Sequence, residues 1–193
     1  MRRAGLLGLL VAAHFVGLLG VHSAAAQDNL KTYRYSKAGN WTISALYNAG
    51  NFLSCYARVS YRNDINVSLI AYENGRWTLQ FYNQNWPRRQ VSKFRAALEV
   101  DGRVLRNTQA TYRGRSVFLE IGRSVDPVRS LVSGRVMTIR SNSGTSSFKL
   151  TNAHDAANGV AECWLHHKRR RDRSGNDAFN SGQQPRGNNR GAF

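Results

Sequence analysis

Alternating apolar and polar residues between Ile65 and Phe81 predict a β-hairpin, and we expect the rest of the fold to be organised around it. Its two strands flank the turn sequence Glu73-Asn74-Gly75. A two-residue loop at residues 74–75 would set apolar side chains opposite polar ones. A three-residue loop at residues 73–75 instead collects six apolar side chains on one face, through the pairs Ala71–Trp77, Leu69–Leu79 and Val67–Phe81. Because a slip of one residue turns every side chain to the other face, the buried face selects the three-residue loop, with Gly75 in the left-handed region.

Similar alternation predicts further strands on both sides of this hairpin. They cover residues 41–45, 55–61, 92–100, 104–112, 117–121, 136–140 and 146–150. The polar segment 27–40 is expected to hold a short edge strand with Tyr33 and Tyr35 on one side. Turn residues separate the strands at 48–51, at Asp101-Gly102 and at 141–144.

Two later segments have the spacing of helices. Asp126-Pro127 supplies a cap residue and a proline at the first helical position, and Gly134 ends the short helix that follows. From Ala153 to His167 the apolar residues recur at helical spacing. The fold expected from the sequence is therefore mainly β, an antiparallel β-sandwich or partly closed barrel with a short helix near 127–133 and a C-terminal helix.

The chain begins with a segment that is typical of an export signal. Arg2 and Arg3 precede an apolar run over residues 6–21, and the three alanines at 24–26 match a small-residue cleavage site. A retained membrane anchor is the alternative, but the run is short and contains a histidine and three glycines. We expect a signal peptide at residues 1–26, one β-rich domain at 27–167 and a disordered basic tail at 168–193. The mature protein is then periplasmic or secreted, with no transmembrane segment after signal cleavage.

Cys55 and Cys163 are the two cysteines of the chain. In an exported protein an isolated pair is most simply one disulfide bond, which here would join the two ends of the domain. A redox-active pair is disfavoured because the two residues lack the Cys-x-x-Cys spacing.

The predicted domain is basic even without its tail. The full chain has a net charge of +17, and residues 27–167 keep +10, from 19 Lys and Arg against 9 Asp and Glu. A field of this sign favours anionic partners and speeds up their encounter. In a periplasm such partners are lipid headgroups, lipopolysaccharide phosphates and polyanionic polymers. The alternative is that the excess of arginine reflects GC-rich coding.

Basic and aromatic residues gather along one predicted pair of strands and form a candidate anion-binding site. The site consists of Trp86, Arg88, Arg89, Lys93, Arg95 and Arg106. If Lys93 and Arg95 share the solvent face of the sheet with Arg106, they form a cationic strip bordered by Tyr82 and Trp86. Guanidinium groups favour phosphate because their planar donors match its oxygens. The alternative is that these side chains keep an exposed face soluble and protect strand edges.

A second basic candidate follows the predicted C-terminal helix. Its residues are Lys168, Arg169, Arg170 and Arg171. This run is expected either to tether the chain to an anionic membrane or polyanion or to oppose the helix dipole.

The sequence predicts no catalytic residues, no metal site and no cofactor. No serine lies in a nucleophile-elbow context, and the acidic residues fall mostly at turns or caps. Cys163-x-x-His166-His167 has the spacing of only half a metal site, without a second cluster, and a disulfide would consume its thiolate, so we interpret these histidines as part of a solvated helix end.

Three motifs together resemble a known family of exported proteins. They are Gly39-Asn40-Trp41-Thr42-Ile43, the following strand with Cys55, and the late segment Phe148-Lys149-Leu150…Ala156…Cys163. Small exported alphaproteobacterial proteins of the invasion-associated locus B family are similar in these features. The resemblance implies an envelope location, no established enzymatic chemistry and a role in host interaction.

The expected function is therefore that of an exported, non-enzymatic envelope protein. Its partner would be an anionic envelope component, namely lipid headgroups or lipopolysaccharide, or else an envelope protein. One alternative is a small periplasmic hydrolase with a site assembled around His154. The other is a non-specific polyanion or nucleic-acid binder, although export and the absence of a recognisable module disfavour specific nucleic-acid recognition.

Overall fold

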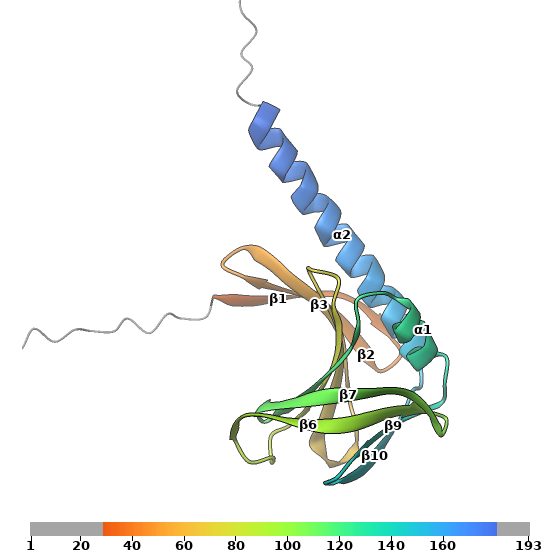
Figure 1. Ribbon diagram of the computed structural model, residues 1–193. Helices are drawn as coiled ribbons and strands as arrows, with labels where there is room; N and C mark the ends of the chain where they lie inside the picture. The colour runs from red at the N-terminus through yellow and green to blue at the C-terminus, as the bar shows by residue number, and fades with distance from the viewer. Residues whose placement is uncertain (1–28, 181–193) are drawn as a thin grey trace, which may run out of the picture.

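Ten strands form one antiparallel sheet in the computed structural model, which describes residues 29–180 (Figure 1). The signal peptide expected at residues 1–26 lies outside this range. The order across the sheet is β1-β2-β3-β4-β5-β8-β7-β6-β9-β10. The strands are β1 Leu30–Ala38, β2 Trp41–Asn48, β3 Asn51–Ser60, β4 Ile65–Tyr72, β5 Trp77–Asn83, β6 Arg89–Val100, β7 Arg103–Gly114, β8 Ser116–Gly122, β9 Val136–Ser141 and β10 Gly144–Lys149.

The central hairpin has the predicted register. Strands β4 and β5 pair Val67 with Phe81, Leu69 with Leu79 and Ala71 with Trp77. The Tyr72 N–H donates to the Arg76 carbonyl at 2.9 Å, so the loop contains three residues, 73–75. Gly75 has a φ of +78°, which places it in the left-handed region as predicted.

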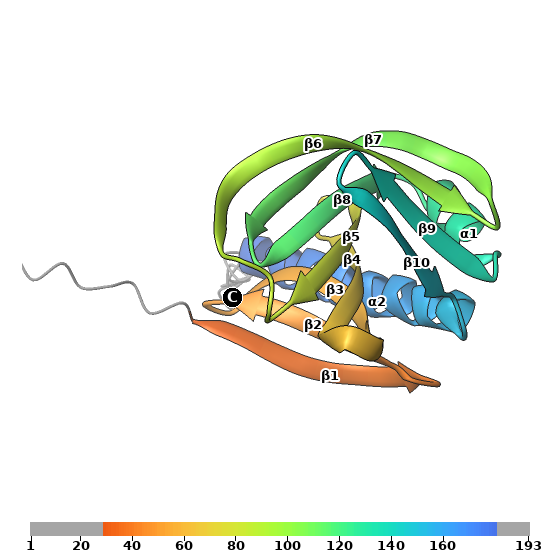
Figure 2. The same ribbon diagram turned by 90° about the horizontal axis from the view of Figure 1, so that it is seen from below.

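The sheet curls on itself, and two helices pack against it (Figure 2). Helix α1 (Asp126–Val132) lies beside β7 and β8, and α2 (Ala153–Asn180) crosses β1 to β4 and contacts α1. The mainly β fold with a short helix and a C-terminal helix is therefore confirmed. Because all the strands belong to one sheet that does not close, the arrangement corresponds to the partly closed barrel rather than the sandwich.

Helix α2 extends beyond His167, the residue at which the folded domain was predicted to end. Residues 168–180 are helical, whereas we expected a disordered tail over 168–193, of which 181–193 lie outside the described residues. The prediction of disorder rested only on the small amount of apolar surface that this segment can bury. A helix makes its backbone hydrogen bonds locally, and the Lys and Arg residues that follow His167 have good helix propensity.

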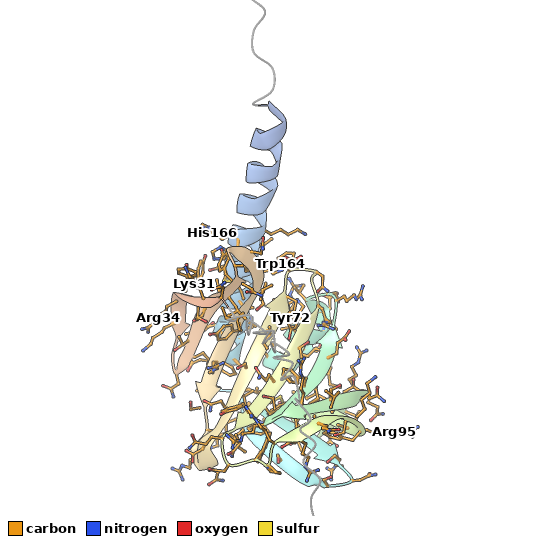
Figure 3. The ribbon with its side chains drawn as sticks, turned by 90° about the vertical axis from the view of Figure 1, so that its left-hand side faces the viewer. Lys31, Arg34, Tyr72, Arg95, Trp164 and His166 are labelled. Atoms are coloured by element: carbon orange, nitrogen blue, oxygen red, sulfur yellow. A yellow bond between two sulfur atoms is a disulfide. The ribbon has the colours of Figure 1, made fainter. Side chains whose placement is uncertain are left out.

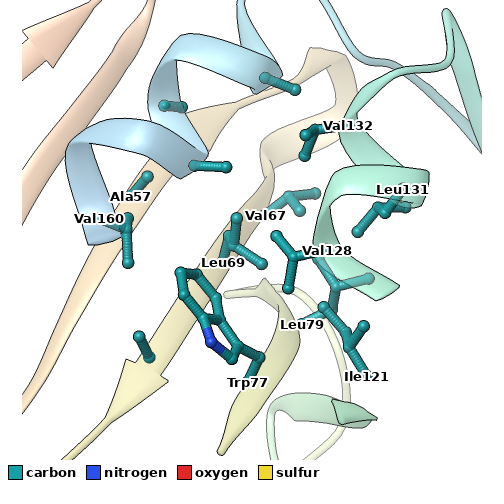
Figure 4. Packing of buried hydrophobic residues seen from close by; sticks show 14 of the residues in the cluster. Ala57, Val67, Leu69, Trp77, Leu79, Ile121, Val128, Leu131, Val132 and Val160 are labelled. Atoms are coloured by element: carbon teal, nitrogen blue, oxygen red, sulfur yellow. The ribbon is translucent and has the colours of Figure 1, made fainter. Parts of the chain in front are cut away.

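The core lies on the concave side of the sheet, beneath both helices (Figure 4). Leu69, Leu79 and Ile121 from the sheet meet Val128 of α1 and Val160 of α2, and each of these side chains is buried. The predicted disulfide is present in this layer. It joins Cys55 of β3 to Cys163 of α2 with a Cα–Cα distance of 6.0 Å, and both residues are fully buried.

Two long-range hydrogen bonds hold the end of β10 and the start of α2 against the first strands. The indole N–H of Trp41 donates to the Thr151 carbonyl at 2.9 Å, and the Tyr61 hydroxyl donates to the Lys149 carbonyl at 2.5 Å. Burial raises the pKa of Tyr61 to about 12. The phenol therefore remains a hydrogen-bond donor throughout the physiological pH range.

Acid should weaken the fold through two carboxylates near the β6–β7 turn. Asp101 accepts hydrogen bonds from the backbone N–H groups of Arg135 and Val136. Glu99 accepts two hydrogen bonds from the Arg140 guanidinium. Because these bonds favour the ionised carboxylates, the pKa of each carboxyl lies below its usual value. Their stabilising effect is fully present above the unfolded-state pKa of about 4 and is lost as the pH falls through the lower folded-state values.

We expect the urea midpoint to fall between about pH 6 and about pH 3, and to fall less steeply in Asp101→Asn, which removes one of the two titrating groups. Parallel midpoint curves for the wild type and this variant would contradict the assignment.

Candidate functional site

The candidate site lies where β6 and the β9–β10 hairpin separate. Strand β6 begins at Arg89, but its pairing with β9 covers only Ala96–Val100. Within the described part of the chain, residues 89–95 therefore have a strand partner on one side only, which is β7. The sheet is open at this point, and the opening leads to its concave side.

A pocket of about 550 Å³ fills this opening. Nine of its 17 lining residues are aromatic or aliphatic, among them Phe81, Phe94, Tyr112, Val117, Ile139 and Phe148. Phe148 is buried and its ring centre lies 5.1 Å from that of Phe81, so the floor of the pocket is continuous with the core. Serine and threonine residues from the β9–β10 hairpin, at positions 141, 143, 145 and 146, also line the pocket.

Two cations lie at the exposed margin of this pocket. Arg89 and Lys93 both line it and are exposed to solvent. The Arg89 guanidinium lies 5.5 Å from the centre of the Tyr112 ring, a cation–π distance. Tyr112 also donates a hydrogen bond to the Pro87 carbonyl at 2.9 Å, and its ring lies 6.2 Å from that of Trp86. These contacts fix the Trp86–Arg89 segment beside the entrance.

The outer face of the sheet carries a second, shallow depression of about 690 Å³. Its lining residues include Arg95, Asn107, Gln109, Arg140 and Asn142, together with two alanines, Ala96 and Ala97. Ser141 lines both this depression and the inner pocket. A ligand seated in the pocket would therefore place its exposed end near these polar side chains.

The structure brings together only part of the anion-binding set predicted from the sequence. Trp86, Arg89 and Lys93 line the inner pocket, and Arg88 is exposed just before β6. Arg95 lies on the outer face, where it pairs with Gln109.

Arg106 does not join the predicted cationic strip. It pairs with Leu98, whose side chain is buried, and its guanidinium donates to the Ile121 carbonyl at 2.7 Å. It therefore lies on the concave side of the sheet, whereas Arg95 is on the outer face, and it lines neither the pocket that Lys93 lines nor the outer depression. Tyr82 is exposed on the outer face of β5 and does not line the pocket with Trp86.

The second basic candidate lies at the other end of the molecule. Figure 3 shows Trp164 and His166 at the end where α2 leaves the sheet, with Arg95 at the opposite end. Lys168 lies 4.6 Å from the centre of the Trp164 ring, and Arg169 is exposed. The backbone of Arg170 and Arg171 belongs to α2, and their side chains are outside the described part. The two basic clusters are therefore separate.

The histidines of α2 differ in their surroundings. His154 is exposed, lies 3.5 Å from the Asp155 carboxylate and lines none of the pockets described above. His166 is exposed as well. His167 is half-buried, and its Nδ1 lies 2.6 Å from the Tyr47 hydroxyl.

Comparisons of the chain with protein-family models, with curated proteins and with solved structures gave no match. Among residues 29–180, the helices are too short or too polar to cross a lipid bilayer. The resemblance to the invasion-associated locus B family stays an expectation from the sequence.

Proposed function

We propose that this protein is a non-enzymatic binding protein of the cell envelope whose ligand is an amphipathic anion. Such a ligand has an apolar chain and a phosphate or carboxylate headgroup, as in anionic phospholipids and the lipid part of lipopolysaccharide. The observation that carries the proposal is an aromatic-walled pocket of about 550 Å³ with Arg89 and Lys93 at its entrance. The Cys55–Cys163 disulfide fits the oxidising compartment in which these lipids are found.

The two parts of the pocket contribute unequally to binding. Ligand pockets typically have volumes of about 300–1,000 Å³, and burial of each ligand methylene contributes about 0.8 kcal/mol. An exposed ion pair contributes only about 0.2–1 kcal/mol. The apolar chain therefore supplies most of the affinity, while Arg89 and Lys93 select the headgroup charge and orient the ligand.

Dodecyl phosphate is a suitable probe, and its binding to the mature chain can be measured by titration calorimetry. We expect inorganic phosphate alone to bind far more weakly, because it leaves the apolar walls unfilled. Ile139→Trp adds bulk to the pocket wall and should abolish binding. Arg89→Gln with Lys93→Gln should weaken it about tenfold, as expected for losing on the order of 1.4 kcal/mol of charge-assisted contact.

A charge-matched control separates this site from the general field of a basic domain. Arg103 and Arg113 are exposed on β7 and line neither the pocket nor the outer depression. Arg103→Gln with Arg113→Gln removes the same charge and should leave dodecyl phosphate binding within about twofold of wild type. An equal loss of binding affinity in both double variants, or unchanged binding in Ile139→Trp, would show that the protein binds polyanions non-specifically.

A further inference from the structure

A second group of chemically reactive side chains lies far from the pocket, where β3 meets the third turn of α2. Cys55, Cys163 and His167 each offer one ligand atom there, and these atoms lie within 4.8 Å of one another. Cys163 and His167 are four residues apart and therefore on the same face of the helix. Cys55 approaches from β3, where it pairs with Ala45 and Ala71.

The surroundings of this group are apolar and ordered. Both cysteines are fully buried, and the His167 ring stacks on Phe52 with the ring centres 5.3 Å apart. The Tyr47 hydroxyl lies 2.6 Å from Nδ1 of His167 and holds the orientation of the imidazole. Hydrogen bonds of this kind orient metal-ligating histidines.

We propose that reduction of the Cys55–Cys163 disulfide turns this group into a Cys₂His site for a thiophilic ion, with Zn²⁺ as the type ligand. A dithiol reductant supplies two electrons and two protons by thiol–disulfide exchange, so that the S–S bond breaks, two thiols form and the reductant becomes a disulfide. Binding of Zn²⁺ then displaces both thiol protons and forms two Zn–S bonds and one Zn–N bond. Water completes the tetrahedral shell from the half-exposed side of His167.

The geometry suits an ion of this size. Zn–S bonds of about 2.3 Å and Zn–N bonds of about 2.0–2.1 Å place tetrahedral ligand atoms about 3.6–3.8 Å apart. The three ligand atoms already lie within 4.8 Å of one another in the oxidised chain, and the two cysteine Cα atoms are 6.0 Å apart. The proposed site requires the two sulfur atoms to separate from bonding distance to this spacing on reduction.

Co²⁺ provides the test because it reports both geometry and ligand type. The mature chain is reduced with a phosphine, freed of excess reductant under argon and titrated with Co²⁺. We expect one equivalent to give the intense visible bands of tetrahedral cobalt and a sulfur-to-cobalt charge-transfer band, and Zn²⁺ to remove both. The oxidised chain should give neither band.

Two neighbouring histidines supply a matched pair of variants. His166 is exposed and adjacent in sequence but is not among the three ligands. His167→Ala should weaken Co²⁺ binding at least about 10–100-fold, since even the loss of an outer-shell partner has that effect. His166→Ala should bind as the wild type does, and Tyr47→Phe should bind about tenfold more weakly.

The state of the reduced fold is followed by near-ultraviolet circular dichroism in the same samples. If reduction alone loosens the domain, Zn²⁺ should restore the folded spectrum in the wild type and in His166→Ala, but not in His167→Ala. Absence of the cobalt bands in the reduced wild type overturns the proposal, whether the chain is folded or not. Equal Co²⁺ affinity in wild type and His167→Ala also overturns it.

Discussion

Replacing both Cys55 and Cys163 by alanine is expected to lower the free energy of unfolding by about 4–5 kcal/mol. The two residues are separated by 108 positions, so the disulfide closes 109 of the 152 described residues into one loop in the unfolded chain. Loop-closure entropy grows with the logarithm of loop length and gives about 4.7 kcal/mol for a loop of about 100 residues. Both side chains are fully buried, and alanine, which is smaller than cysteine, introduces no polar atom at either place.

Urea denaturation at neutral pH measures this effect. Because the disulfide acts on the unfolded state, the variant should keep the near-ultraviolet spectrum of the wild type while its unfolding midpoint falls and its m-value rises. The wild type reduced in the presence of a chelator should unfold like the double variant. A loss below about 1 kcal/mol would show that the oxidised native state is strained or that the unfolded chain retains structure.

Local sequence patterns were sufficient for those parts of the fold that depend on neighbouring residues. The register of the β4–β5 hairpin followed from the requirement that Leu69 and Leu79 share a buried face, and Gly75 took the positive φ that its loop needs. The disulfide followed from the number of cysteines and from the predicted export signal. Neither inference required knowledge of which strands are neighbours in space.

The sheet order lies beyond such patterns. Strand β8 pairs with β5, while β6, which follows β5 in the chain, lies two strands further out. Alternation specifies which face of a strand is buried but carries no information on its non-local neighbours. The pocket depends on this order because it lies at the gap between β6 and β9, and its aromatic walls look like ordinary core residues in the sequence.

The wrong prediction for Arg106 has a local cause in the pairing of β6 with β7. Continuing the pairing from the Asp101–Gly102 turn would set Arg106 opposite Ala97, on the outer face with Arg95. An irregularity between Leu98 and Glu99 shifts the register by one residue, so that Arg106 pairs with Leu98 instead. The same shift directs Tyr112 to the concave side, where it lines the pocket. Bulges commonly re-aim side chains in this way, and here one bulge removes a cation from the outer face and adds an aromatic wall to the site.

The second large effect is expected at Trp41, which should have a purely structural role. Its side chain is 3 % exposed, and its indole donates to the Thr151 carbonyl two residues before α2 begins. Trp41→Ala leaves a cavity, which typically costs about 3–5 kcal/mol, and also removes the partner of a backbone carbonyl. Trp41→Phe keeps most of the packing and should cost about 1–2 kcal/mol, mainly through the lost hydrogen bond.

Trp86 provides the opposite case in the same chain. It is half-buried at the pocket entrance, and its ring lies 6.2 Å from Tyr112. Trp86→Ala should lower the free energy of unfolding by less than about 1 kcal/mol, as is usual for substitutions outside the core. The same substitution should weaken dodecyl phosphate binding at least about tenfold, because the ligand chain loses an aromatic wall. Urea denaturation and titration calorimetry on both variants test this contrast. If Trp41→Phe weakened binding as much as Trp86→Ala does, the pocket would not be the binding site, because a substitution outside the pocket would then act as strongly as one in its wall.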